Sequence, residues 1–347
     1  MRNSEQTFQE TNELRRHDEL GVTLLELMVS MVLFTMITGL VMGLMNAARQ
    51  SRAAIESQLQ VTKGARMGLN LLGRETYNAG YGYPVDSSVR VPDGRLSARL
   101  GTPADTDSTR DKVPPIIAGN NLNANNMNPG PATMTDQVTF LFRDLSFNVS
   151  GTGVSQPLSI NAVTTDLATG IDEVIPISGD NSQCDKNDVL LVTGNNGSAI
   201  AVVTDTPGAN KLQFSNGDIL NFNLTGATGP LTAIQTPGSI VRVRMVTYFV
   251  TAAGVLTRRE FGNDETLTST QPYVDAPLVY NVENLQIQYL MDDGALLDNP
   301  SSANLEKVRQ VRFVLSVRTN ELDAEGQPRR ITQTSTFSTR NIGYDAS

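Results

Sequence analysis

A single acidic side chain lies inside an otherwise apolar stretch near the start of the chain. The 24 residues from Val22 to Met45 carry one charge, that of Glu26. A carboxylate is disfavoured in apolar surroundings, and an acid retained in such a segment usually has a functional partner. Gly21 directly precedes the stretch, and the polar tract 15–19 precedes the glycine. Glu26 is therefore the first candidate for chemistry in this sequence.

Side chains for ordinary catalysis are scarce elsewhere. The only histidine is His17, which lies upstream of Gly21, and the only cysteine is Cys184. A mature chain that begins after Gly21 would have no histidine, which excludes Ser-His-Asp and Cys-His catalysis and most zinc sites. A single cysteine cannot form a disulfide within the chain. We therefore expect no enzyme and no cofactor, and a membrane-anchored hydrolase is the weakest alternative.

One acidic loop has part of the pattern of a calcium site. Asp105, Asp107 and Asp111 are separated by other residues, as the ligands of calcium loops are. The position of the turn glycine is occupied by Arg110, and no distal glutamate completes the ligand set. The three aspartates are therefore weak calcium candidates, and we expect an acidic loop without a metal.

The apolar stretch is long enough to cross a membrane as a helix. At ~1.5 Å per residue it would reach ~36 Å, against a hydrocarbon core of ~30 Å. An ordinary cleaved secretory signal fits poorly, because its apolar part is shorter and ends at a small-residue site. The helix should continue through residues 46–79 and end at Gly80. In this continuation, apolar residues spaced by three or four positions predict a face that contacts a globular domain. They include Ile55, Leu59, Leu69 and Leu72.

The remaining sequence changes character twice. Residues 80–135 are rich in Asp, Asn, Pro and Gly and lack apolar periodicity, so they should form an irregular, loop-rich insertion. Residues 136–347 read as a β-rich globular domain, with hairpins predicted at 189–204, 211–224 and 240–261. The predicted fold class is α+β. A long N-terminal helix, membrane-spanning in one half and amphipathic in the other, packs on antiparallel β-sheet.

The segment around Gly21 resembles the class III signal of type IV pilins and type II secretion pseudopilins. In that signal a polar leader ends at a glycine, and the first mature residue precedes Thr-Leu-x-Glu-Leu and an apolar helix. Here the corresponding residues are Gly21, Val22 and Thr23-Leu24-Leu25-Glu26-Leu27. The resemblance implies that residues 1–21 are a leader, removed after Gly21 by a prepilin peptidase, and that Val22 is then N-methylated. Two features depart from the pattern: Val22 replaces phenylalanine, and acidic Asp18-Glu19 lies close to the glycine.

The resemblance also implies a role for Glu26. In filaments of this family, the N-terminal amine of one subunit neutralises the buried glutamate of a neighbour. Here the Val22 amine would meet Glu26 of the adjacent subunit, and a slipped subunit would leave a buried charge unpaired. The pair would therefore fix the axial register. From the residues alone, an ordinary interfacial glutamate is the alternative.

Location and partners follow from the same resemblance. Residues 22–45 would form a transmembrane helix in the bacterial inner membrane, with the N-terminus cytoplasmic and the C-terminal domain periplasmic, and later the filament core. Expected partners are the prepilin peptidase, other minor and major pilins, the inner-membrane assembly platform and membrane lipid. The formal net charge is −9, and basic pairs such as Arg258-Arg259 and Arg329-Arg330 are isolated. Direct binding of nucleic acid is therefore not expected.

The C-terminal half is similar to the PilW-like minor pilins and to J-type pseudopilins. The similarity lies in a hairpin followed by Val282–Tyr289, Asp292-Asp293-Gly294 and Val308–Arg318, and in Leu71–Glu75 at the helix end. The length of 347 residues favours the PilW-like group. This similarity implies a minor pilin that primes pilus assembly or lies at the pilus tip, with motility or cell adhesion as the wider role. A J-type pseudopilin and a pilus-borne adhesin or binding module stay open as alternatives.

Overall fold

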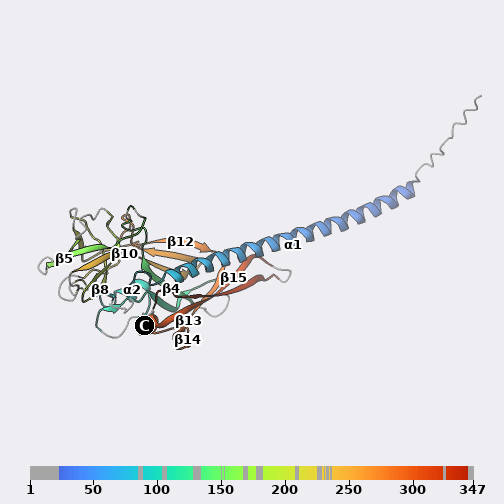
Figure 1. The fold of residues 1–347 in the computed structure, drawn as a ribbon. Coiled ribbons are helices and arrows are strands. Elements are labelled where there is room, and N and C mark those ends of the chain that lie inside the picture. The colour runs from blue at the N-terminus through green and yellow to red at the C-terminus, as the bar shows by residue number, and fades with distance from the viewer. Residues whose placement is uncertain are drawn as a thin grey trace, which may run out of the picture. The chain divides into compact units, whose positions relative to one another are not determined.

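The chain divides into two compact units in the computed structural model, one ending at Ile55 and the other beginning at Glu56. Figure 1 colours the described elements from the N-terminus to the C-terminus. The described residues are 23–84, 89–103, 108–127, 134–149, 151, 153–166, 171–176, 183–207, 211–224, 229, 231, 234, 237–322 and 326–342.

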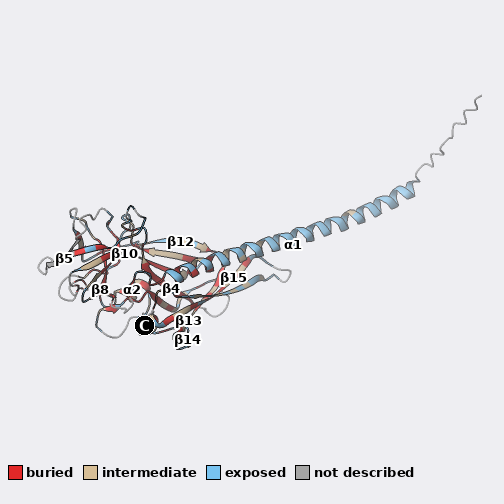
Figure 2. Ribbon diagram, in the orientation of Figure 1, coloured by how far each residue is buried: buried red, intermediate tan, exposed pale blue. Residues whose placement is uncertain are grey.

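Helix α1 runs from Leu24 to Asn78 and contains 55 residues. Its large apolar side chains between Leu24 and Met45 are all exposed (Figure 2). In the second unit, Ala65, Leu69 and Leu72 are buried, because spacings of three and four residues place them on one face. The predicted apolar face is thus confirmed from Ala65 onward, whereas Leu59 is 53% exposed.

The helix ends where a glycine is required. The Ala79 N–H donates to the Glu75 carbonyl in the last helical hydrogen bond, and Gly80 follows with a φ of 78°. This left-handed conformation is the usual helix terminator and favours glycine. A Cβ at Gly80 would also lie 2.8 Å from the carbonyl oxygen of Asn341, so the close approach of the C-terminal segment leaves no room for a side chain.

Twelve of the described strands form one sheet, which is antiparallel except for a parallel contact between β1 and β8. Strand β10 (Gly238–Val250) links its two parts: residues 238–242 pair with β7, and residues 243–250 pair with β4 and β11. The other strands are β1 (Val89–Val91), β2 (Asp111–Lys112), β3 (Ile116–Ala124), β4 (Met134–Arg143), β5 (Leu158–Asp166), β6 (Ile171–Pro176), β7 (Val189–Gly194), β8 (Gly197–Val202), β9 (Leu212–Ser215), β11 (Leu256–Phe261) and β12 (Tyr273–Val279).

A second sheet has the order β14-β13-β15-β16 and is antiparallel. Its strands are β13 (Val282–Met291), β14 (Leu296–Leu297), β15 (Val308–Leu322) and β16 (Pro328–Ser338), and the short helix η2 (Ser302–Lys307) precedes β15. Ala65, Leu69 and Leu72 of α1 share one hydrophobic core with side chains of both sheets, such as Tyr248 and Phe313. The second half of the helix therefore packs on β-sheet, which confirms the predicted α+β fold.

Two sequence predictions need correction. Residues 80–135 are not simply irregular: they contain β1, β2, β3, the first residues of β4 and helix α2 (Arg95–Leu100). These strands are short or polar, so they leave little apolar periodicity, yet Val89 and Val91 of β1 are fully buried beside β8.

The hairpin predicted at 211–224 is also wrong, because β9 pairs with β6. The residues after β9 fold around Asp218 instead. The Asp218 carboxylate accepts the N–H groups of Leu220, Phe222 and Asn223 at 2.9, 3.3 and 2.7 Å. An acidic side chain that satisfies three backbone donors stabilises a turn in place of a strand. The hairpins β7–β8 and β10–β11 are confirmed.

Candidate functional site

The predicted processing residues precede the described part of the helix. Gly21 and Val22 lie outside the described residues, which begin at Thr23. Helix α1 starts at Leu24, so the bond between Gly21 and Val22 comes before the first helical residue in the sequence. Cleavage after Gly21 and methylation of Val22 stay predictions.

Thr23 and Glu26 form a reciprocal cap at the start of α1. Thr23 Oγ1 accepts the Glu26 N–H at 3.2 Å. Glu26 Oε2 accepts the Thr23 N–H at 3.2 Å and the Thr23 hydroxyl at 3.3 Å. This is a capping box, in which a hydroxyl residue and a glutamate three positions later satisfy N–H groups that the helix leaves open. The carboxylate also lies at the positive end of the helix dipole.

Glu26 is exposed, and within the described residues its side chain bonds only to Thr23. A cation from outside the chain therefore has access to the carboxylate. Glu26 was predicted as the site from the sequence, whereas Thr23 was not predicted as its partner. The Thr-x-x-Glu spacing before an apolar run was the signal that would have identified it.

The residues that follow Glu26 suit an apolar environment. The hydroxyl of Thr35 donates to the carbonyl of Val32 at 2.8 Å, and that of Thr38 to the carbonyl of Phe34 at 2.7 Å. Hydroxyls bonded to their own helix place no unsatisfied polar group in lipid. By length and composition, α1 is the one helix in the described part of the chain that is suited to crossing a membrane.

A second carboxylate on α1 is buried against the sheet. Glu75 is 2% exposed, and its Oε1 lies 3.5 Å from Nη2 of Arg74 and 3.7 Å from Nε of Arg258. Arg258 also contacts Glu260 at 2.8 Å, and Glu260 contacts Arg244 at 2.6 Å. Burial raises the pKa of Glu260, but the hydrogen bonds from Arg244 and Arg258 outweigh this effect and bring the pKa below its usual value. This network connects the helix to strands β10 and β11.

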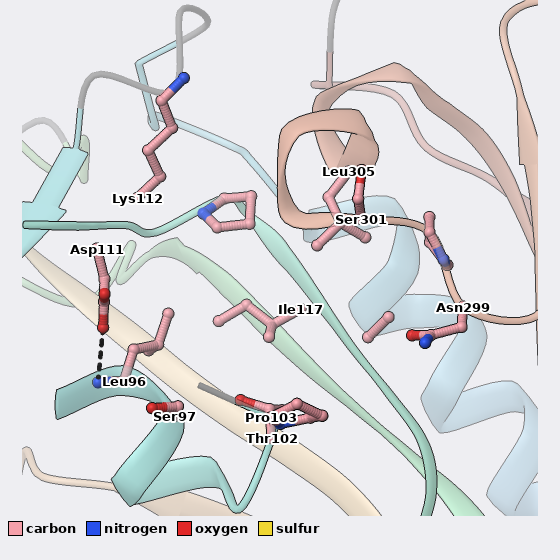
Figure 3. A pocket seen from close by; sticks show the side chains of 13 residues that line it. Leu96, Ser97, Thr102, Pro103, Asp111, Lys112, Ile117, Asn299, Ser301 and Leu305 are labelled. Atoms are coloured by element: carbon pink, nitrogen blue, oxygen red, sulfur yellow. Dashed lines mark hydrogen bonds between the residues drawn. The ribbon is translucent and has the colours of Figure 1, made fainter. Parts of the chain in front are cut away.

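Of the three weak calcium candidates, Asp111 alone lies in the described structure. Its Oδ2 accepts the N–H of Leu96 at 3.3 Å, and it lines a cavity of about 340 Å³ between α2, β3 and the segment that includes Asn299 (Figure 3). Asp105 and Asp107 lie outside the described residues. Within the part that is described, no group of three or more His, Cys, Asp or Glu side chains is placed to hold a metal ion. The weak calcium site stays a prediction.

Cys184 is 4% exposed and belongs to a hydrophobic core cluster that also contains Phe147 and Leu190. In such a cluster a cysteine acts as a small hydrophobic side chain.

A known sequence motif covers the start of the chain. Residues 16–42 match the prokaryotic N-terminal methylation motif, and this range includes Gly21, Val22 and Glu26. No curated protein matches the chain. The motif supports a type IV pilin-like protein, a class of structural subunits that a prepilin peptidase processes and that assemble with other pilins. An apolar helix near the N-terminus agrees with a membrane-anchored protein of this kind.

Proposed function

From this motif and the exposed apolar helix, we propose that the chain is a minor type IV pilin. It is made as a precursor, cut after Gly21 by the prepilin peptidase and methylated at Val22. Residues 22–45 hold it in the bacterial inner membrane, with the N-terminus in the cytoplasm and the β-rich domain in the periplasm. The same helix later enters the filament core, where the subunit primes assembly or lies at the tip.

The cap at Glu26 is the observation that carries this proposal. In the monomer the carboxylate is bonded to Thr23 alone among the described residues, and it is exposed. Cleavage creates a cationic amine at Val22, and a charge-assisted hydrogen bond to this amine is stronger than the bond to a neutral N–H. The amine of a neighbouring subunit therefore replaces or joins the Thr23 N–H at Glu26 during assembly. A subunit out of register would leave the carboxylate without this cation.

The proposal that the chain is a PilW-like minor pilin rests on its C-terminal half. The segments in which the similarity to PilW-like minor pilins lies belong to strands β13 and β15, which pair with each other in antiparallel fashion. The chain of 347 residues is large for a main filament subunit. A J-type pseudopilin is the nearest alternative. Genes for pilus retraction beside this one favour the minor pilin, and a secretion operon favours the pseudopilin.

Processing provides the first test. Mass spectrometry of the protein from the cell envelope should find a methylated Val22 as the first residue. A Gly21→Ser variant should leave an uncut precursor that migrates more slowly on a gel. The matched control is Gly39→Ser, because Gly39 has open space around it and lies within the helix. Residues 1–21 still attached to the wild-type protein would contradict the proposal.

A further inference from the structure

Two arginines lie shortly after the apolar stretch of helix α1. Arg49 and Arg52 are the only charged residues in the sequence between Met45 and Glu56, and both are exposed. At ~1.5 Å per residue, they follow Met45 by about 6 and 10 Å along the helix. Both belong to the first compact unit, which ends at Ile55. The first unit therefore carries a short basic segment at one end of its apolar surface.

Helix geometry directs both side chains back toward the apolar stretch. The Cα–Cβ bonds of an α-helix tilt toward its N-terminus, which is the side on which the apolar residues lie. In that direction the next acid on the helix is Glu26, several turns away. Because Arg49 and Arg52 are three positions apart, they lie close together on one face of the helix. The two guanidinium groups thus lean together toward a region without an acid.

The ion pairs between described residues include neither of these arginines. In the sequence, Glu56 follows Arg52 by four positions. For a pair on one helix this is the weaker order, because a glutamate is better placed before its cation than after it. The positive charges of Arg49 and Arg52 are therefore available to an anion from outside the chain.

Phosphate is an anion that suits both the chemistry and the position of this pair. A guanidinium group is always charged and presents N–H donors in a planar fork that binds two phosphate oxygens at once. The headgroup layer of a bilayer extends about 5–8 Å beyond the hydrocarbon core. With residues 22–45 across the core, Arg49 lies at this layer, and Arg52 reaches it through its long side chain.

We propose that Arg49 and Arg52 bind the phosphate of an acidic phospholipid at the membrane surface where the apolar stretch ends. The net negative charge of such a lipid adds an attraction that a zwitterionic lipid lacks. The contact holds the helix at a fixed depth until the subunit leaves the membrane. This inference rests on the proposed function, because it takes residues 22–45 to span the membrane. It holds for either orientation of the chain, since both leaflets contain phosphates.

The lipid selectivity of the full-length protein tests this contact. Protein purified from the cell envelope is reconstituted into vesicles of phosphatidylcholine with about 30% phosphatidylglycerol, and spin-labelled forms of the two lipids report which one the protein holds. We expect a preference for phosphatidylglycerol of at least about threefold, and Arg49→Gln, Arg52→Gln should remove most of it. The matched control is Gln50→Ala, an exposed neutral position beside Arg49, which should keep the preference. An equal preference in the wild type and the double variant would overturn the proposal.

A rearranged variant separates lipid from a contact with another subunit. Lipid surrounds a membrane helix on every side, whereas another subunit contacts one face of it. The variant Arg49→Gln, Gln50→Arg, Ser51→Arg, Arg52→Ser keeps the composition, the charge and the depth of this segment and moves the charges around the helix. It should keep the preference for phosphatidylglycerol. Loss of the preference would show that the arginines act on one face, as in a contact between subunits, and would overturn the lipid contact.

The first residue of the protein, read by mass spectrometry in the same samples, reports separately on the proposed function. A protein that begins at Val22 and shows no lipid preference would contradict the lipid contact alone. A protein that still carries residues 1–21 but prefers phosphatidylglycerol through Arg49 and Arg52 would contradict the pilin proposal and support the lipid contact. Free inorganic phosphate should leave the preference unchanged, compared with sodium chloride at the same ionic strength. A specific loss with phosphate would show that the site binds the free ion, and would overturn the proposal.

Discussion

The two halves of helix α1 differ in what covers their apolar side chains. Between Leu24 and Met45 every large apolar side chain is exposed, and the carboxylate of Glu26 bonds to its own first turn. From Ala65 onward the apolar face is buried, and the Glu75 carboxylate lies 3.7 Å from Arg258 of strand β11. The β-sheets of the same chain cover the apolar face of the second half. The first half needs lipid or other subunits, because an exposed apolar surface of this length marks an interaction site.

Removing the charge of Glu26 is the most disruptive way to test this difference. Glu26→Gln keeps an oxygen for the cap with Thr23 but cannot neutralise an amine. Breaking a buried ion pair from one side costs about 3–5 kcal/mol, so incorporation into pili should fall at least ~tenfold while cleavage after Gly21 continues. The measurement is the ratio of protein in sheared pili to protein in membranes.

The control for this experiment is Glu56→Gln, because Glu56 is an exposed glutamate on the same helix. It should enter pili normally. Normal incorporation of the Glu26→Gln variant would remove Glu26 from the assembly mechanism, even if the protein is still processed as a pilin.

The second unit should respond to pH through the buried acid Asp188, whereas the described residues of the first unit include no buried acid. Burial raises the pKa of Asp188 to about 6, despite Arg242 at 3.4 Å and the N–H of Asp185 at 3.1 Å. The folded state therefore holds a proton between about pH 4 and 6 that the unfolded state has released. Asp188 should thereby add about 2–3 kcal/mol to the stability as the pH falls from 7 to 4.

Urea unfolding of the full-length protein in detergent, followed across this pH range, checks the prediction. Asp188→Asn should remove the contribution of Asp188, so the rise should be smaller in this variant than in the wild-type protein. Below about pH 4 stability should fall again, because Asp144 has a lowered pKa: burial raises it, but hydrogen bonds from Ser146 and the charge of Arg242 outweigh that effect. A stability that is constant between pH 4 and 7 would show that Asp188 is not desolvated in solution.

Glycines provide a matched comparison between the halves. A Cβ at Gly73 would lie 2.3 Å from the ring of Phe337, whereas one at Gly39 would meet nothing within 4 Å. Gly73→Ala should lower the free energy of unfolding of the second unit by about 1–2 kcal/mol, since overpacking outweighs the gain in helix propensity. Gly39→Ala should leave that value unchanged. Equal effects in a urea titration would contradict the different environments of the two glycines.

Patterns that are local in sequence predicted much of the fold and part of the site. The apolar face of α1, its end at Gly80 and the β7–β8 hairpin all depend on periodicity or on turn residues close by. Glu26 was identified because one charge in an apolar run is conspicuous. Its exposure and its bonds to Thr23 were not predicted, although a fixed spacing of three residues encodes the cap.

Contacts between residues that are distant in the sequence could not be predicted from local sequence patterns. In the sequence Arg258 belongs to an isolated basic pair, yet its side chain lies between Glu75 and Glu260 because β11 is placed under the end of α1. Residues 80–135 were expected to be irregular, since strands as short as β1 carry no periodicity of their own. The capping of β13 by Asn125 and Asp136 likewise depends on how two sheets meet.

The smallest expected effect concerns the charge of Glu75, and it sharpens the contrast with Glu26. Glu75→Gln removes a buried carboxylate whose contacts to arginine are long, 3.5 and 3.7 Å. Arg258 keeps Glu260 at 2.8 Å, so no cation is left unpaired. Because the long contacts return little of the desolvation cost of the carboxylate, the free energy of unfolding should change by less than about 1 kcal/mol, and incorporation into pili should be normal. A loss above ~3 kcal/mol in urea unfolding would mean that Glu75 holds the helix on the sheet by its charge. With the expected result, Glu26 is the acid on this helix whose charge matters for assembly. Glu75 is then a buried acid whose Oε1 lies near Arg74 and Arg258 and whose Oε2 has no hydrogen-bond partner among the described residues.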